Sequence, residues 1–190
     1  LHFNSLDKFT RNAISGDPKS ALIEKMKLEP DLEKNGKINN TLKQGQIVLV
    51  QVSKEPISTK GPRICSEISF AGRYLVLIPF SNKISISSKI KKTEEKNRLR
   101  RLIQSIRPNN FGIIIRTFAE NKNVAELDAD LKDLYSKWQT IYKKLPKAVP
   151  PLKLVSEIDK SSAILRDLLT DDFNNVYVND AEVYDDLKTY

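Results

Sequence analysis

The amino-acid sequence predicts an α+β fold, and three observations lead to this prediction. Short apolar, β-branched runs cluster between residues 47 and 78, as is typical of neighbouring strands. Two amphipathic helices are expected at 93–107 and from about 124 to 145, with one strand between them. Beyond a proline-rich junction, short strand-like and helix-like segments alternate, which indicates a piece of an α/β layer.

The strand predictions begin with residues 47–52, a compact apolar run that indicates a buried strand. Residues 63–70 then alternate apolar with polar side chains, which predicts a half-buried strand. A third strand is expected at 74–78, ended by Pro79. Strands this close together favour a small barrel or an antiparallel sheet. For the region before them, a short helix at 21–26 and a long charged excursion between two strands remain equally open.

The helix predictions depend on apolar side chains that recur along one helical face. The stripe of the first helix is Leu99, Leu102, Ile103 and Ile106, with Pro108 as a natural stop. A strand at 112–115 then delivers Arg116 and Thr117 at its C-terminal end. The stripe of the second helix is Val124, Leu127, Leu131, Leu134, Trp138 and Ile141.

The last part of the chain follows a stiff junction made by Pro146, Pro150 and Pro151. Strands are expected at 152–155 and 176–178, and helices at 161–169 and 181–187. Only about 40 residues remain here, too few to close a sizeable core alone.

The charge of the chain is uneven. The formal net charge is +8, which favours an anionic partner such as RNA, DNA or an acidic membrane. Residues 83–107 carry nine basic and two acidic side chains, a local +7, whereas residues 167–190 carry seven acidic and one basic, a local −6. The middle of the chain is therefore the better candidate for RNA binding.

Rare residue types exclude several classes of protein. A lone Cys65 forms no internal disulfide or cysteine-rich zinc site, and indicates a reducing compartment, the cytoplasm or an organelle stroma. His2 is the only histidine, which disfavours a histidine triad. No apolar run reaches the roughly 18 residues that a membrane span needs. The chain starts without a methionine, so we expect the natural N-terminus to lie upstream.

Two short segments are candidate phosphate contacts. The basic connection at 54–61 contains Lys60 beside Gly61, and loops of small barrels commonly bind oligonucleotides. The alternative is an ordinary hairpin loop with exposed lysines. Gly72, between two expected strands, permits close approach of a ligand, or simply a tight bend.

The third candidate is the pair Arg116 and Thr117 at a strand end. A guanidinium can fork onto two phosphate oxygens, and a hydroxyl can donate a third hydrogen bond. The alternative is a surface arginine in an ion pair, for example with Glu120.

Catalytic motifs are not evident in the sequence. Asp128 and Asp130 are two residues apart on an expected helix, so they point to different faces. The pairs at 171–172 and 185–186 fit helix capping or solvated charge. A Walker loop, a zinc-ligand spacing and a nucleophile elbow are all absent from the sequence.

Several motifs together resemble the ribonuclease E/ribonuclease G family. The matching segments are 45–52, 54–56, 59–61, 71–79 and 115–117, supported by Asp130-Leu131, Trp138 and Pro150-Pro151-Leu152. Their order and spacing fit across about 145 residues, from Gly45 onward.

The resemblance implies three regions. Residues 1–66 would be the later part of an OB-fold RNA-binding domain, 67–151 the 5′-sensor region, and 152–190 the start of an RNase H-like subdomain. The family's magnesium-binding catalytic carboxylates and zinc-linking cysteines would lie beyond Tyr190, and its RNA-stacking aromatic residues before Leu1. This chain itself would then hold neither a metal nor the catalytic residues.

The resemblance also assigns binding residues. The positions that match the family's pocket for an RNA 5′-monophosphate are Gly72, Val76, Arg116 and Thr117, and its RNA-touching barrel lysine falls at Lys60. The implied partner is single-stranded RNA with a 5′-monophosphate, and the full-length protein is expected to form homo-oligomers. The leading hypothesis is thus the RNA-binding and 5′-end-sensing part of a Mg²⁺-dependent endoribonuclease. A stand-alone OB-fold RNA-binding module and a purely structural fragment are the alternatives.

Overall fold

The computed structural model describes residues 23, 28, 42–145, 148–156, 160–169 and 172–189. The chain divides into two compact units, Leu1–Gln139 and Thr140–Tyr190, each described separately below. The three regions expected from the family resemblance, with boundaries at 66/67 and 151/152, stay a prediction. No helix in the described part of the chain is both long enough and apolar enough to span a membrane.

A two-stranded antiparallel sheet begins the first unit. It pairs β1 (Gln51–Lys54) with β2 (Arg63–Cys65). The predicted buried strand at 47–52 is therefore wrong in its start and in its burial, because Ile47 is 68% and Val52 56% exposed. A strand extends only as far as a partner pairs with it. Because β2 has only three residues, β1 is short as well. Across the described residues the two strands make an open pair, so the OB-fold barrel also stays a prediction.

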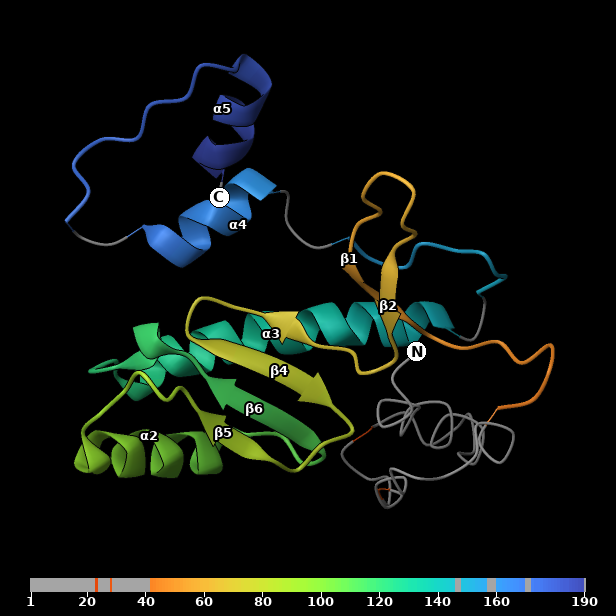
Figure 1. Cartoon of the computed structure of the whole chain (residues 1–190). Helices are drawn as coiled ribbons and strands as arrows, with labels where there is room; N and C mark the ends of the chain where they lie inside the picture. Colours follow the sequence, from red (N-terminus) through yellow and green to blue (C-terminus); the bar gives the residue numbers. More distant parts are fainter. Residues whose placement is uncertain are drawn as a thin grey trace. The chain divides into compact units, whose positions relative to one another are not determined.

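A four-stranded sheet forms the centre of the first unit (Figure 1). Its strands are β3 (Phe70–Ala71), β4 (Leu75–Pro79), β5 (Ile84–Ile86) and β6 (Phe111–Ile115), in the order β3-β4-β6-β5. β5 and β6 are parallel, and the other pairs are antiparallel. The predicted strands at 74–78 and 112–115 are confirmed as β4 and β6, whereas β5 was not expected.

The single strand predicted at 63–70 is wrong, because the chain divides there into β2 and β3, which belong to different sheets. The side chain of Gln51 explains the break. Its Oε1 accepts the Ser69 N–H at 2.9 Å, and its Nε2 donates to the Ser69 carbonyl at 3.1 Å. These bonds use the backbone groups that a continuous ladder would need.

Two helices pack against the sheet of the first unit. α2 (Thr93–Ile106) confirms the first predicted helix and buries Leu99 and Ile103. α3 (Val124–Lys144) confirms the second, and its last residues extend into the second unit. Its predicted stripe is buried except at Val124, which is 43% exposed in the first turn. Asn123 and Glu126 explain that start, because each side chain accepts the other's backbone N–H, as in a capping box.

The core lies between one face of the sheet and α3. Along β4 buried residues alternate with half-buried ones, and on β6 the exposed Ile114 lies between buried neighbours, so only one face is fully covered. Trp138 on α3 makes edge-to-face contacts with Phe70, Phe80 and Phe111, at ring-centroid distances of 6.2, 5.6 and 6.5 Å. On the other face Ile114 remains 37% exposed.

The second unit contains α4 (Lys160–Leu168) and α5 (Ala181–Thr189), which contact each other. Both helices were expected. The strands predicted at 152–155 and 176–178 are wrong, because these residues belong to no strand. Val155 is 41%, Val176 50% and Tyr177 91% exposed, so their apolar pattern does not reflect burial.

The short helix considered at 21–26 falls mostly outside the described residues. Ile23 is described and buried, and its carbonyl accepts a 2.7 Å hydrogen bond from Nδ2 of Asn110.

Candidate functional site

Arg116 lies where β6 ends, beside the first residues of β4. Its backbone N–H donates to the Tyr74 carbonyl at 2.8 Å, which continues the pairing of β4 with β6. Its guanidinium Nη1 donates to the Gly72 carbonyl at 2.6 Å. Arg116 and Gly72, which are 44 residues apart in sequence, therefore meet directly.

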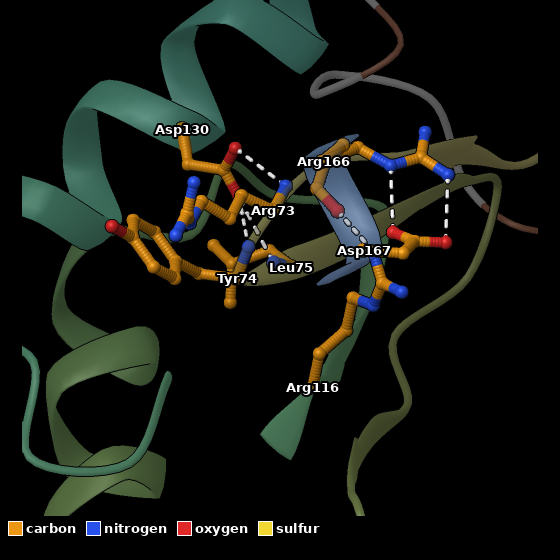
Figure 2. Close-up of polar contacts among 8 residues, drawn as sticks. Arg73, Tyr74, Leu75, Arg116, Asp130, Arg166 and Asp167 are labelled. Carbon is orange, nitrogen blue, oxygen red and sulfur yellow. Dashed lines mark hydrogen bonds and ion pairs between the residues drawn. The ribbon is translucent and has the colours of Figure 1, made fainter. Parts of the chain in front are cut away.

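The backbone at Gly72 makes a tight turn between β3 and β4, which we call the Gly72 turn (residues 72–75). The Gly72 N–H donates to the Leu75 carbonyl at 2.8 Å. Asp130 of α3 accepts the next three backbone N–H groups, those of Arg73, Tyr74 and Leu75, at 3.2, 3.0 and 2.9 Å. Figure 2 shows this carboxylate above the turn. The turn is thus held from α3 by one side chain.

The same carboxylate explains why residue 72 is a glycine. A Cβ atom at Gly72 would lie 2.5 and 2.6 Å from the two Asp130 oxygens, closer than atoms approach without displacement. Any side chain at this position would have to displace the chain's own carboxylate. Of the two sequence-based interpretations of Gly72, the structure thus provides a direct reason for the tight bend.

Val76 and Thr117, the other two residues of the proposed pocket, belong to β4 and to the segment after β6. Val76 pairs with Ile114 across β4 and β6 and is half-buried, so it shares the less covered face of the sheet with Ile114 and Arg116. Thr117 begins the short 3₁₀ helix η4 (Thr117–Ala119). Its hydroxyl lies 2.9 Å from that of Ser87, and either oxygen can be the donor.

Ser87 and Asp130 are site residues that sequence reasoning missed. Ser87 follows β5, and its N–H donates to the Ile115 carbonyl at 2.9 Å, which places it beside the end of β6. Its Oγ also accepts the Lys89 N–H at 3.3 Å. The alternation of Ile84-Ser85-Ile86 was a weak signal for β5 and hence for Ser87. Asp130 was noticed only as a carboxylate on a helix face, and no local pattern reveals its contact with the turn.

Lys60 lies on the β1–β2 hairpin, outside the four-stranded sheet. We call residues 54–61 the Gly61 loop. Ile57 and Lys60 exchange backbone hydrogen bonds of 3.1 and 3.0 Å around Ser58, which has φ +52°. Every residue of this loop is exposed. The geometry is that of a hairpin turn that presents a lysine to solvent, so both interpretations of the loop remain open.

The positive charge predicted at 83–107 lies largely on and just before α2. Lys89, Lys91, Lys92, Arg100 and Arg101 are exposed. Arg98 pairs with Glu95 through Nη2 and Oε1 at 2.6 Å. This hydrogen bond lowers the pKa of Glu95, against the opposing effect of its burial, and raises the pKa of Arg98.

Carboxylates do not gather into a metal site in the described part of the chain. No group of three or more His, Cys, Asp or Glu side chains there is arranged to hold an ion.

The class defined by the fold is a mixed α+β protein, in which a guanidinium and two hydroxyl groups gather at neighbouring strand ends. The family follows from comparison of the sequence. The model of the "Ribonuclease E/G family" matches residues 69–190, and the chain belongs to this family.

Curated relatives agree with this assignment. The chain is 37% identical over 153 residues to a "Ribonuclease E" of Nostoc, covering 80% of this chain and 22% of the relative. It is 35% identical over 144 residues to a Synechocystis "Ribonuclease E", covering 76% and 21%. It is 30% identical over 150 residues to an Escherichia coli "Ribonuclease G", covering 79% and 31%. The chain thus spans between a fifth and a third of the length of these relatives.

One solved structure, a Staphylococcus aureus RNase P protein mutant, is also similar. It covers 37% of this chain and 73% of its own, with 20% identity and a TM-score of 0.30, which is too low to establish a shared fold.

Proposed function

We propose that this chain binds RNA and senses its 5′-monophosphate end, as part of a ribonuclease E/G-type endoribonuclease for RNA processing and decay. The observation that supports this most strongly is the arrangement at the end of β6. There the Arg116 guanidinium is fixed by the Gly72 carbonyl, with the Thr117 hydroxyl in the next residue.

The proposed phosphate ligands are side chains of Arg116 and Thr117. A guanidinium carries five N–H donors in a planar fork, and the bond to Gly72 uses one of them. If Ser87 donates to Thr117, the Thr117 proton is directed away from Ser87, and it can then meet a phosphate oxygen. Val76 would contribute shape beside the 5′ nucleotide. A 5′-hydroxyl end offers no charged oxygens to these donors, so it would gain less from the same contacts.

The charge around α2 would attract the rest of the RNA. Its exposed arginines and the lysines before it face solvent, and phosphate contacts of this kind add affinity without reading bases. Lys60 on the Gly61 loop would add one such contact. Binding would then select RNA ends through Arg116 and RNA in general through the other cations.

The hydrolytic step is proposed for the complete protein. The relatives are named as ribonucleases and are three to five times longer than the matched part. Catalytic carboxylates, Mg²⁺ and homo-oligomer contacts would belong to those further segments. Family membership favours this proposal over a stand-alone OB-fold binding module.

The experiment compares two short RNAs of one sequence that end in a 5′-monophosphate or a 5′-hydroxyl. The wild-type chain should bind the 5′-monophosphate about tenfold or more tightly. Arg116→Ala should reduce that ratio to about one. Arg100→Ala, which removes an exposed arginine of α2, should lower the affinities for both RNAs equally and leave the ratio of these affinities unchanged. Equal binding of the two RNAs by the wild type would refute the proposal.

A further inference from the structure

We propose that Asp130 is a positioning residue, which holds the Gly72 turn so that the turn's carbonyl aims Arg116 at the RNA 5′ phosphate. This inference rests on the function proposed above and adds a residue of α3 to that site. The Asp130 carboxylate would not touch the RNA. It would act through the backbone of residues 72–75.

The first step concerns the three N–H groups that converge at the turn. Consecutive backbone N–H groups pointing to one spot form a concave site for an anion. Here Asp130 fills that site, with its oxygens 2.9 to 3.2 Å from the nitrogens of Arg73, Tyr74 and Leu75. The anion that the turn binds is therefore the chain's own carboxylate. These N–H groups are consequently not the phosphate ligands.

The second step concerns the carbonyl of the same turn. The Gly72 carbonyl accepts the Arg116 guanidinium at 2.6 Å, while the neighbouring peptide N–H groups bond to Asp130. The turn is thus held between α3 and the end of β6 (Figure 2). A shift of Asp130 would move the peptide units, and with them the acceptor that fixes one edge of the guanidinium.

The third step concerns the missing side chain at Gly72. Any larger residue would push its Cβ into the Asp130 oxygens, which lie 2.5 and 2.6 Å from that position. The effect of Gly72→Ala should therefore depend on whether residue 130 carries the carboxylate. Such dependence is what a double-mutant cycle measures.

The experiment uses the full chain and the two RNAs described above. For each variant, the quantity is the ratio of the Kd for the 5′-hydroxyl RNA to the Kd for the 5′-monophosphate RNA. Asp130→Ala should lower this ratio about tenfold, while the Kd for the 5′-hydroxyl RNA changes less than about twofold. Asp133→Ala is the matched control, because this exposed carboxylate of the same helix pairs with Lys137, and it should leave the ratio unchanged.

The cycle adds Gly72→Ala to both backgrounds. Its readout is the temperature of thermal unfolding, which Gly72→Ala should lower by several degrees in the wild type and much less with Asp130→Ala, where the overlapping oxygens are gone. If Asp130→Ala does not fold, as judged by its thermal unfolding, Asp130→Asn replaces it. The asparagine keeps one acceptor oxygen and should lower the ratio about threefold.

The outcomes separate the two proposals. A wild-type ratio near one refutes 5′-end sensing itself, and the role of Asp130 with it. A wild-type preference that is undiminished in Asp130→Ala, or in Asp130→Asn where that variant is used, refutes only the role of Asp130. The same conclusion follows if the affinities for both RNAs fall equally, or if Gly72→Ala has the same effect in both backgrounds.

Discussion

The Gly72 turn and the Gly61 loop both connect antiparallel strands through a glycine, but their surroundings differ. Gly72 is buried, with the Asp130 carboxylate against it and the Arg116 guanidinium on its carbonyl. Gly61 is exposed, and a Cβ added there would meet nothing within 4 Å. The first turn is held by two other elements, whereas the second is an exposed connection of two short strands.

The difference indicates how binding tasks are divided in the proposal. Distinguishing two RNA ends requires donors that are held in one geometry, because a fixed fork favours the end that carries a phosphate. The Gly72 turn gives Arg116 that support. General attraction of a polyanion requires only an accessible cation, such as Lys60 on the Gly61 loop.

The largest expected effect is on stability at the two glycines. Gly72→Ala should lower the free energy of unfolding by about 1–3 kcal/mol, because its Cβ would overlap the Asp130 oxygens. Gly61→Ala should change it by about 0.5 kcal/mol or less, since that site is open and its φ is not positive. Urea unfolding of both variants measures the difference. Equal losses would show that the two turns are equally tolerant.

A smaller effect is expected from exchanging the two kinds of cation. Arg116→Lys should lower the preference for 5′-monophosphate RNA about tenfold, because an ammonium cannot bond the Gly72 carbonyl and a phosphate with a planar fork. Lys60→Arg should leave the preference unchanged, since Lys60 would act as a point charge. Binding titrations of the paired RNAs provide the readout. A preference that survives in Arg116→Lys would contradict the geometric role given to the guanidinium.

Removal of the lysine should have a weaker, uniform effect. Lys60→Ala should lower the affinity for both RNAs about two- to threefold and reduce the slope of log K against log salt by about 0.7, the value for one single-strand phosphate contact. The slope is measured by titrations at several salt concentrations. An effect on only the 5′-monophosphate RNA would place Lys60 at the sensing site instead.

The smallest effect concerns pH and the support of η4. The Glu95 Oε1 accepts the Asn121 N–H at 2.9 Å, which ties the loop after η4 to α2. Because the bond to Arg98 holds the pKa of Glu95 below its usual 4.5, this carboxylate stabilises the fold above that pH. The contribution is lost as pH falls through the lowered pKa. Between about pH 6 and pH 3, the wild type should therefore lose slightly more stability than Glu95→Gln. Identical profiles of stability against pH for the wild type and Glu95→Gln would contradict this role of Glu95.

Sequence patterns predicted the parts of the fold in which buried residues recur with the spacing of a helix or a strand. The apolar stripe from Leu127 to Trp138 lies along one helix face and is buried, so its spacing was sufficient to predict α3. Residues 152–155 and 176–178 are equally apolar in sequence, but no strand forms there in the described residues. An apolar segment forms a strand only where another strand pairs with it. The sequence of a short segment does not show whether such a partner exists.

Within the candidate site, the family resemblance identified Gly72, Val76, Arg116 and Thr117, and the structure brings Gly72 and Arg116 into direct contact. The contact of Asp130 with the Gly72 turn could not be predicted, because Asp130 lies 55 or more residues from the turn in sequence. Ser87 was missed for a different reason: β5 has three residues, too few for a clear period. Tertiary contacts and very short strands thus account for the two omissions.

In the proposed function, a fixed guanidinium recognises the RNA end, rather than charge in general. The most direct measurement is the ratio of wild-type affinities for the 5′-monophosphate and 5′-hydroxyl RNAs at low and high salt. High salt should weaken both complexes through the phosphate contacts they share and leave most of the ratio in place. A ratio that starts near one, or that falls to one as salt rises, would contradict recognition by Arg116.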